Sequence, residues 1–162
     1  MKLPTKIILT SGIGMGSTKL NAFDNALLNA GIGNFNLLQT SSIIPPKAKI
    51  IYLTKSKQGK LLPSIGSVVP TVYCYIFGEK VGIRITAILG LGIPKNYKEH
   101  NGVIFEFAGT NITKDKAKKT CGRMIEEAFN SRNLEIEKIQ FIEADCLVKK
   151  KYTCVIVAAL LI

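Results

Sequence analysis

The stretch Gln39-Thr40-Ser41-Ser42-Ile43-Ile44-Pro45-Pro46-Lys47 places two adjacent hydroxyl groups between an apolar run and a double proline. The apolar run before it is Phe35-Asn36-Leu37-Leu38. Proline fixes its own φ and pushes the preceding residue towards extended geometry, so the chain beyond Ser42 is stiff and cannot continue as a helix. This predicts a serine pair at the end of a rigid strand. Because serine is common in turns, the surrounding residues must decide whether the pair carries chemistry.

Length and composition indicate one domain with a sizeable core, since the chain has 162 residues of which 47% are hydrophobic. The apolar C-terminal segment 152–162 is too short to span a bilayer. Residues 1–7 lack the apolar core of a signal peptide, so we expect a cytoplasmic protein without membrane contact. The cysteines are far apart and lie in apolar patterns, which predicts buried thiols without disulfides or a metal site. They are Cys74, Cys121, Cys146 and Cys154.

The formal charge of +11 is typical of proteins that bind polyanions. The lysines are dispersed, however, and the single tight run, Lys149-Lys150-Lys151, is typical of a turn between strands. Aromatic residues make up 7% of the chain, and no recognition helix or RNA-binding motif is evident. These features favour a solvated basic surface, with nucleic-acid binding as the alternative.

In the first half of the chain, residues 21–30 have apolar side chains at helical spacing and are followed by a glycine, which predicts a helix. The glycine-rich segment 11–17 lacks the ending of a phosphate-binding loop and the spacing of a dinucleotide motif. We interpret it as a flexible loop that lets the backbone approach a neighbouring element. Composition predicts strands at 6–10, 34–42 and 49–53 and a basic loop at 54–67.

In the second half, β-branched and aromatic residues predict strands at 68–77, 81–93 and 103–108. Thr113 is a good N-cap for a long helix whose apolar stripe, which includes Met124, ends at Phe129. The last two strands, 135–148 and 151–161, are predicted to form a hairpin across the lysine turn. Two helices and about seven strands predict an α+β fold in which helices cover sheet faces.

Two polar residues in apolar surroundings are candidates for a site. Asn36 is either a bracket for a turn or a hydrogen-bond donor at a site, because a buried amide must be hydrogen-bonded. Glu106 lies between two phenylalanines of a strand, and alternation alone would point it to solvent. If it faces a cavity instead, desolvation raises its pKa and makes it a proton donor near neutral pH.

Three segments, taken together and in this order, resemble the pyruvoyl-dependent arginine decarboxylases. They are residues 20–37 (LNAFDNALLNAGIGNFNL), Ser41-Ser42-Ile43-Ile44-Pro45-Pro46, and Ile104-Phe105-Glu106-Phe107. The similarity covers nearly the whole chain and is densest from residue 20 to residue 46. It implies a single domain built as a four-layer αββα sandwich, which assembles as a homotrimer of αβ units with active sites at subunit interfaces.

The resemblance also implies a proenzyme that cuts itself between Ser41 and Ser42 into a β chain, 1–41, and an α chain, 42–162. The Ser42 hydroxyl attacks the Ser41 carbonyl and turns the amide into an ester. Elimination then leaves dehydroalanine, which hydrolyses to a pyruvoyl group and ammonia. Cleavage needs donors for the oxyanion, and Asn36 is expected to assist in this step or in substrate binding.

In turnover, the ketone of the pyruvoyl cofactor takes up the electrons released as carbon dioxide leaves L-arginine, and agmatine is the product. Glu106 matches the family's catalytic glutamate, which delivers a proton to the resulting carbanion. Asp24 matches the acidic contact to the substrate guanidinium. Gly33, Phe35 and Ser41 are expected to line the same pocket.

A protein of charge +11 should repel a cationic substrate, but screening within a Debye length lets pocket carboxylates such as Asp24 and Glu106 set the local sign. Three alternatives remain. The first is a pyruvoyl-dependent decarboxylase of another amino acid, such as histidine, for which no acidic partner at the far end of the pocket is needed. The second is a pyruvoyl enzyme with a Gly-Ser junction, which the Ser-Ser junction disfavours. The third is a non-enzymatic basic module that binds nucleic acid and stays uncut.

Overall fold

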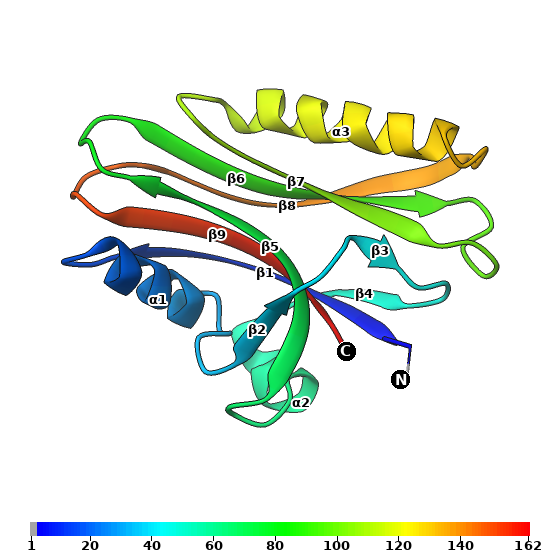
Figure 1. Cartoon of the computed structure of the whole chain (residues 1–162), viewed down its shortest axis with the longest axis horizontal. Helices are drawn as coiled ribbons and strands as arrows, with labels where there is room; N and C mark the ends of the chain where they lie inside the picture. The colour runs from blue at the N-terminus through cyan, green and yellow to red at the C-terminus, as the bar shows by residue number, and fades with distance from the viewer. Residues whose placement is uncertain (1–2) are drawn as a thin grey trace.

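Two β-sheets lie face to face in the computed structural model, which describes residues 3–162, and a long helix packs on the outer side of each sheet (Figure 1). The five-stranded sheet, in order β2-β5-β9-β1-β4, contains β1 (Lys6–Met15), β2 (Asn36–Gln39), β4 (Lys49–Tyr52), β5 (Val68–Gly78) and β9 (Thr153–Leu161). The four-stranded sheet, in order β3-β7-β6-β8, contains β3 (Ile43–Ile44), β6 (Arg84–Pro94), β7 (Gly102–Thr110) and β8 (Ile136–Leu147). The α-helices are α1 (Lys19–Asn29), α2 (Gln58–Leu61) and α3 (Lys114–Asn130). The predicted α+β single domain is confirmed.

The main core fills the space between the two sheets. Val155 and Val157 of β9 belong to one buried cluster with Ile85 and Leu89 of β6. All of β9 from Thr153 to Leu160 is buried, because this central strand is covered by the other sheet on one face and by α1 on the other. A strand covered on both faces needs a continuous apolar sequence, and β9 has one.

Glycines in β1 let α1 lie directly on the sheet. A Cβ atom at Gly12 would stand 2.1 Å from the carbonyl oxygen of Ala26, and one at Gly14 would stand 2.2 Å from the Ala26 nitrogen. The predicted close approach of the backbone is therefore confirmed, but the prediction of a loop over 11–17 was wrong for residues 11–15. β1 continues to Met15 and pairs with β9 from Ile7 to Met15. Glycine is tolerated within this strand because it lets the backbone of α1 approach closely.

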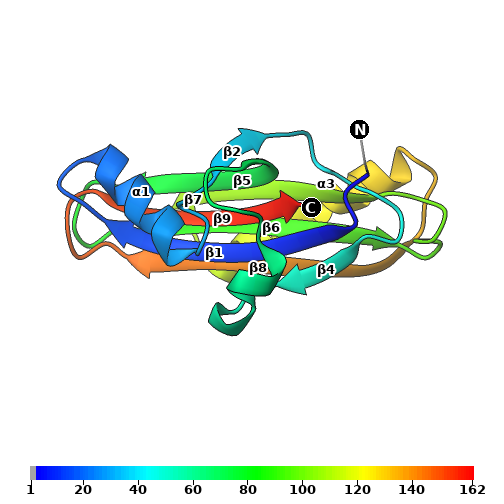
Figure 2. The same ribbon diagram turned by 90° about the horizontal axis from the view of Figure 1, so that it is seen from below.

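The helix α3 begins as predicted, with the Thr113 hydroxyl accepting a hydrogen bond from the Lys116 N–H at 3.3 Å. Its buried side chains, among them Ile125 and Phe129, pack on the outer face of the four-stranded sheet. Gly92 of β6 gives them room, since a Cβ there would lie 2.5 Å from the Ile125 side chain. Seen from below in Figure 2, α1 crosses β1 and β9, whereas α3 lies behind the two sheets.

The predicted closing hairpin was wrong. β8 pairs with β6, whereas β9 pairs with β1 and β5, so the turn at Lys149-Lys150-Lys151 carries the chain from one sheet to the other. The uniform burial of β9 fits the centre of a sheet, while the partly exposed pattern of β8 fits an edge. The segment 34–42 is also not one strand, because β2 covers only Asn36–Gln39 and residues 40–42 form the link to β3. The predicted loop 54–67 contains a 3₁₀ turn (Lys55–Lys57) and α2.

No helix within the described residues, 3–162, combines the length and the apolar character needed to cross a membrane.

Candidate active site

Ser41 and Ser42 lie in the link between β2 and β3, which belong to different sheets. On one side of the pair, the Thr40 N–H donates to the Thr71 carbonyl of β5 at 3.2 Å. On the other side, the Ser42 carbonyl accepts a hydrogen bond from the Ile104 N–H of β7 at 2.8 Å. The serine pair therefore crosses the opening between the sheets and is held by backbone bonds to both of them.

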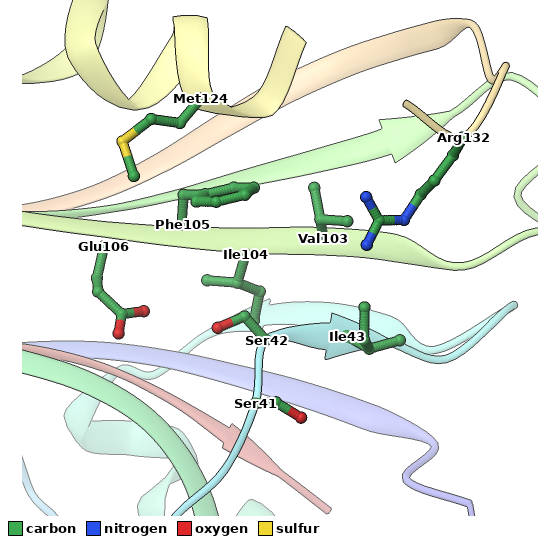
Figure 3. A pocket seen from close by; sticks show the side chains of 9 residues that line it. All are labelled: Ser41, Ser42, Ile43, Val103, Ile104, Phe105, Glu106, Met124 and Arg132. Carbon is green, nitrogen blue, oxygen red and sulfur yellow. The ribbon is translucent and has the colours of Figure 1, made fainter. Parts of the chain in front are cut away.

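A pocket of about 530 Å³ opens beside this link (Figure 3). β3 pairs only with Gly102 and Val103, so the edge of β7 beyond Ile104 is open and the pocket wraps around it. Because side chains alternate along a strand, Ile104 and Glu106 face one side of β7 while Val103 and Phe105 face α3. The pocket is lined by Ser41, Ser42, Ile43, Val103, Ile104, Phe105, Glu106, Met124 and Arg132.

The carboxyl group of Glu106 is half-buried and points towards Ser42 in Figure 3. Its Oε2 atom is enclosed and has no hydrogen-bond partner among the described residues. Burial raises the pKa of Glu106 above its usual range, because a carboxylate without partners loses more from desolvation than a neutral carboxyl. Of the two interpretations of this residue, the one in which it faces a cavity is confirmed. Such a carboxyl is suited to hold and deliver a proton.

Two thiols bracket Glu106 from opposite faces of its sheet. Cys74 of β5 donates its S–H to the Phe107 carbonyl at 3.8 Å, and Cys121 of α3 donates to the Phe105 carbonyl at the same distance. Burial raises the pKa of Cys74 to about 12 and that of Cys121 to about 11, and the nearby Glu106 carboxylate adds to both shifts. Both thiols are therefore neutral, and they make the surroundings of Glu106 less polar without adding a charge.

Asn36 does not line this pocket. Its side chain is exposed, and its Nδ2 donates to the Gly66 carbonyl at 2.8 Å, which fastens the start of β2 to the turn before β5. This hydrogen bond fits the interpretation of Asn36 as a structural bracket, whereas the assumption that its amide is buried was wrong. The side chain lies outside the apolar layer because the strand β2 is at the edge of its sheet.

Asp24 also lies away from the pocket. It is exposed on α1, on the outer side of the five-stranded sheet, whereas the pocket borders the four-stranded sheet. One turn after Asp24, Leu28 contacts Gly33, where a Cβ would stand 2.8 Å from the Leu28 Cδ2 atom. Phe35 follows and packs partly buried against the cluster beneath α1. A single chain thus brings Ser41, Ser42 and Glu106 together, and it holds the other predicted substrate contacts on a separate surface.

Two of the pocket residues that sequence reasoning did not assign to the site come from α3 and the turn after it. Met124 was assigned to the core stripe of α3 but forms part of the pocket wall, and Arg132 follows the end of that helix. Neither residue stands out in its local sequence. Their place at the site depends on α3 lying over the open edge of β7, which only the tertiary structure reveals.

Comparison with known proteins decides the family. A family model described as pyruvoyl-dependent arginine decarboxylase matches residues 6–162. The pyruvoyl-dependent arginine decarboxylase of Methanocaldococcus jannaschii is 43% identical over 149 residues, which are 92% of this chain and 85% of the relative. The protein of the same name from Pyrococcus abyssi is 40% identical over 158 residues, 98% of this chain and 95% of the relative. The chain belongs to the pyruvoyl-dependent arginine decarboxylase family.

The resemblance stated from the three sequence segments is thus confirmed, and it extends over nearly the whole chain. Among solved structures, a pyruvoyl-dependent histidine decarboxylase at pH 8 is similar with a TM-score of 0.51 and 13% identity. The match covers 62% of this chain and 52% of that chain, so it spans about half of the longer protein. At this identity it supports the fold, and the family assignment rests on the arginine decarboxylase relatives.

Proposed function

We propose that the protein decarboxylates L-arginine to agmatine and carbon dioxide, using a pyruvoyl group made from its own Ser42. The observation that carries the proposal is the shared pocket of the serine pair and Glu106, in a chain of this family. When present at Ser42, a pyruvoyl ketone supplies the electron sink that lets carbon dioxide leave an amino acid. The enclosed, unpartnered oxygen of Glu106 beside Ser42 fits a site for such a group.

In the proposed maturation, the Ser42 hydroxyl attacks the Ser41 carbonyl and the chain separates into 1–41 and 42–162. Backbone bonds from Thr40 to Thr71 and from Ile104 to Ser42 hold the two sides of the junction while the carbonyl is attacked. The first two residues of the shorter chain lie outside the described residues. Around the cut, α1, the two sheets and α3 form the layers of the proposed αββα sandwich.

In the proposed reaction, Glu106 acts as the general acid. Burial keeps its carboxyl protonated to a higher pH than that of an ordinary glutamate, so a proton is available at the carbon that has lost carbon dioxide. Ile104, which lies on the same side of β7 as Glu106, supplies an apolar wall beside this proton.

We further propose that Asp24 binds the guanidinium group of the substrate from a neighbouring copy of the chain. A carboxylate pairs with a guanidinium through two parallel hydrogen bonds, and the exposed position of Asp24 leaves it accessible for such a contact. Since Asp24 does not line the pocket of its own chain, the complete site requires two subunits. A homotrimer in which each interface joins one Asp24 surface to one Ser42 pocket meets this requirement.

The test is intact mass spectrometry of the denatured protein, combined with carbon dioxide release from arginine, histidine, lysine and ornithine. We expect two chains that meet at Ser41 and Ser42, with arginine as the fastest substrate. Ser42→Ala should stay uncut and inactive, whereas Ser17→Ala, which removes an exposed hydroxyl far along the chain from the junction, should be cut normally. An unbroken, inactive wild-type chain after long incubation would contradict the proposal, and a much faster reaction with another amino acid would contradict the substrate.

A further inference from the structure

One cationic side chain, Arg132, lines the pocket around Ser42. It comes from the turn after α3, and Figure 3 shows its guanidinium beside Val103, at the opposite end of the labelled group from Glu106. The separation agrees with the electrostatics of Glu106, whose raised pKa is caused by burial and not lowered by a neighbouring guanidinium. The pocket therefore has an acidic end at Glu106 and a cationic end at Arg132, and Ser42 lines the same pocket.

The side chain of Arg132 is exposed, is tied to α3 by one hydrogen bond and keeps its charge unpaired. Its Nη1 donates to the Ala128 carbonyl in the last turn of α3 at 2.8 Å. Among the described residues this is its only hydrogen bond, and no carboxylate lies within ion-pair distance of it. A guanidinium carries five N–H donors in a planar fork whose geometry matches a carboxylate. An anchored guanidinium with free donors in a pocket is suited to bind a carboxylate.

We infer that Arg132 binds a carboxylate beside Ser42 and so orients the contents of the pocket; this inference rests on the proposed function. Two carboxylates have that position in the proposed reaction: the α-carboxylate of the substrate and the new carboxyl terminus at Ser41 after cleavage. In either case Arg132 repels the guanidinium group of the substrate. The substrate then has its side chain directed away from the end of α3, towards the surface that Asp24 supplies.

The experiment compares Arg132→Gln with Arg132→Lys and with Arg123→Gln, a control on the exposed face of α3 that does not line the pocket. The KM for arginine is measured beside the inhibition constant of agmatine, which is the same molecule without the carboxylate. If the substrate carboxylate is the partner, Arg132→Gln raises the KM for arginine by roughly 10- to 100-fold and leaves the inhibition constant of agmatine unchanged. The reason is that the variant loses hydrogen bonds to a carboxylate that only arginine carries. Arg132→Lys should recover part of this loss.

If the Ser41 carboxylate is the partner, the KM for arginine and the inhibition constant of agmatine change by the same factor or do not change. Arg132→Gln then lowers the melting temperature of the cleaved protein clearly more than that of the uncut Ser42→Ala protein. The inference is overturned if Arg132→Gln matches Arg123→Gln in every measurement. It is also overturned if the variant lowers the melting temperature of cut and uncut protein equally without separating arginine from agmatine, since that is the effect of losing the bond to Ala128 alone. If the wild-type protein is cut and active, the proposed function stands even when the inference about Arg132 fails.

Discussion

Replacing Glu106 by glutamine should move activity and stability in opposite directions. The amide keeps the shape of the side chain but cannot supply the proton, and loss of a general acid costs roughly 10²- to 10⁴-fold in turnover. The folded state, however, gains at neutral pH. The raised pKa means that the folded protein holds the Glu106 proton more tightly than the unfolded chain does, so ionisation penalises the folded state.

The sign of this effect sets its pH dependence. Below the ordinary glutamate pKa of about 4.3 the carboxyl is neutral in both states, and the penalty is absent. The penalty grows as pH rises above that value and is complete above the raised pKa of Glu106. Because solvent reaches about half of the side chain, we expect Glu106→Gln to gain at most about 1 kcal/mol at pH 8 and nothing at pH 4. In a chain of this size, that corresponds to roughly 2–4 °C in melting temperature.

Melting curves at several pH values, recorded in the Ser42→Ala background so that each sample is one uncut chain, test this prediction. Glu143→Gln is the matched control. Burial alone would raise the pKa of Glu143, but the ammonium groups of Lys118 and Lys114 at 2.5 Å and 3.1 Å lower it overall. Removal of that charge should be neutral or slightly destabilising at pH 8. Loss of stability in Glu106→Gln at all pH values, or near-normal turnover in the cleaved variant, would refute the role given to Glu106.

Two further predictions concern assembly and packing. Asp24→Asn and Glu106→Gln should each be nearly inactive, but co-refolding the two variants in equal amounts should restore about a quarter of the wild-type sites. Random mixing pairs an intact Asp24 surface with an intact Glu106 pocket at about that frequency. Mixtures that stay as inactive as their components would show that both residues act within one chain. Gly14→Ala should destabilise the protein by about 1–3 kcal/mol, because the new Cβ meets the Ala26 backbone at 2.2 Å. Gly59→Ala, with no atom within 4 Å of its added carbon, is the control, and equal melting temperatures for the two variants would contradict the tight contact between β1 and α1.

Features that short segments specify could be predicted from sequence. The start of α3 depends on Thr113 and on an apolar stripe, both of which are local, and the structure has both. Glu106 between two phenylalanines marked a carboxyl in apolar surroundings, which the structure confirms as a half-buried group with a raised pKa. The serine pair and its prolines marked a strand end, although β2 already ends at Gln39 and the pair lies in the link that follows.

Features that depend on partner strands could not be predicted. The short turn between β8 and β9 has the sequence of a hairpin, but the strands join different sheets because each finds a better-matched neighbour elsewhere in the chain. Gly12 and Gly14 suggested a loop because nothing local reveals that a helix will cover that face of β1. Arg132 reaches the pocket only because α3 packs over β7, and Asn36 is exposed only because β2 is an edge strand.

The position of the proposed cut explains how the fold can survive it. Segment 1–41 contributes β1, which lies between β9 and β4 and pairs with β9 at nine positions, and β2, which pairs with β5. The Ser41–Ser42 bond belongs to none of these ladders, so breaking it removes no strand pairing. After cleavage, Ser42 is still held through its carbonyl to the Ile104 N–H, two residues along β7 from Glu106. The distance between the new terminus and the acid is therefore set by the sheet and not by the bond that is lost, and this is what a cofactor formed at a chain end requires.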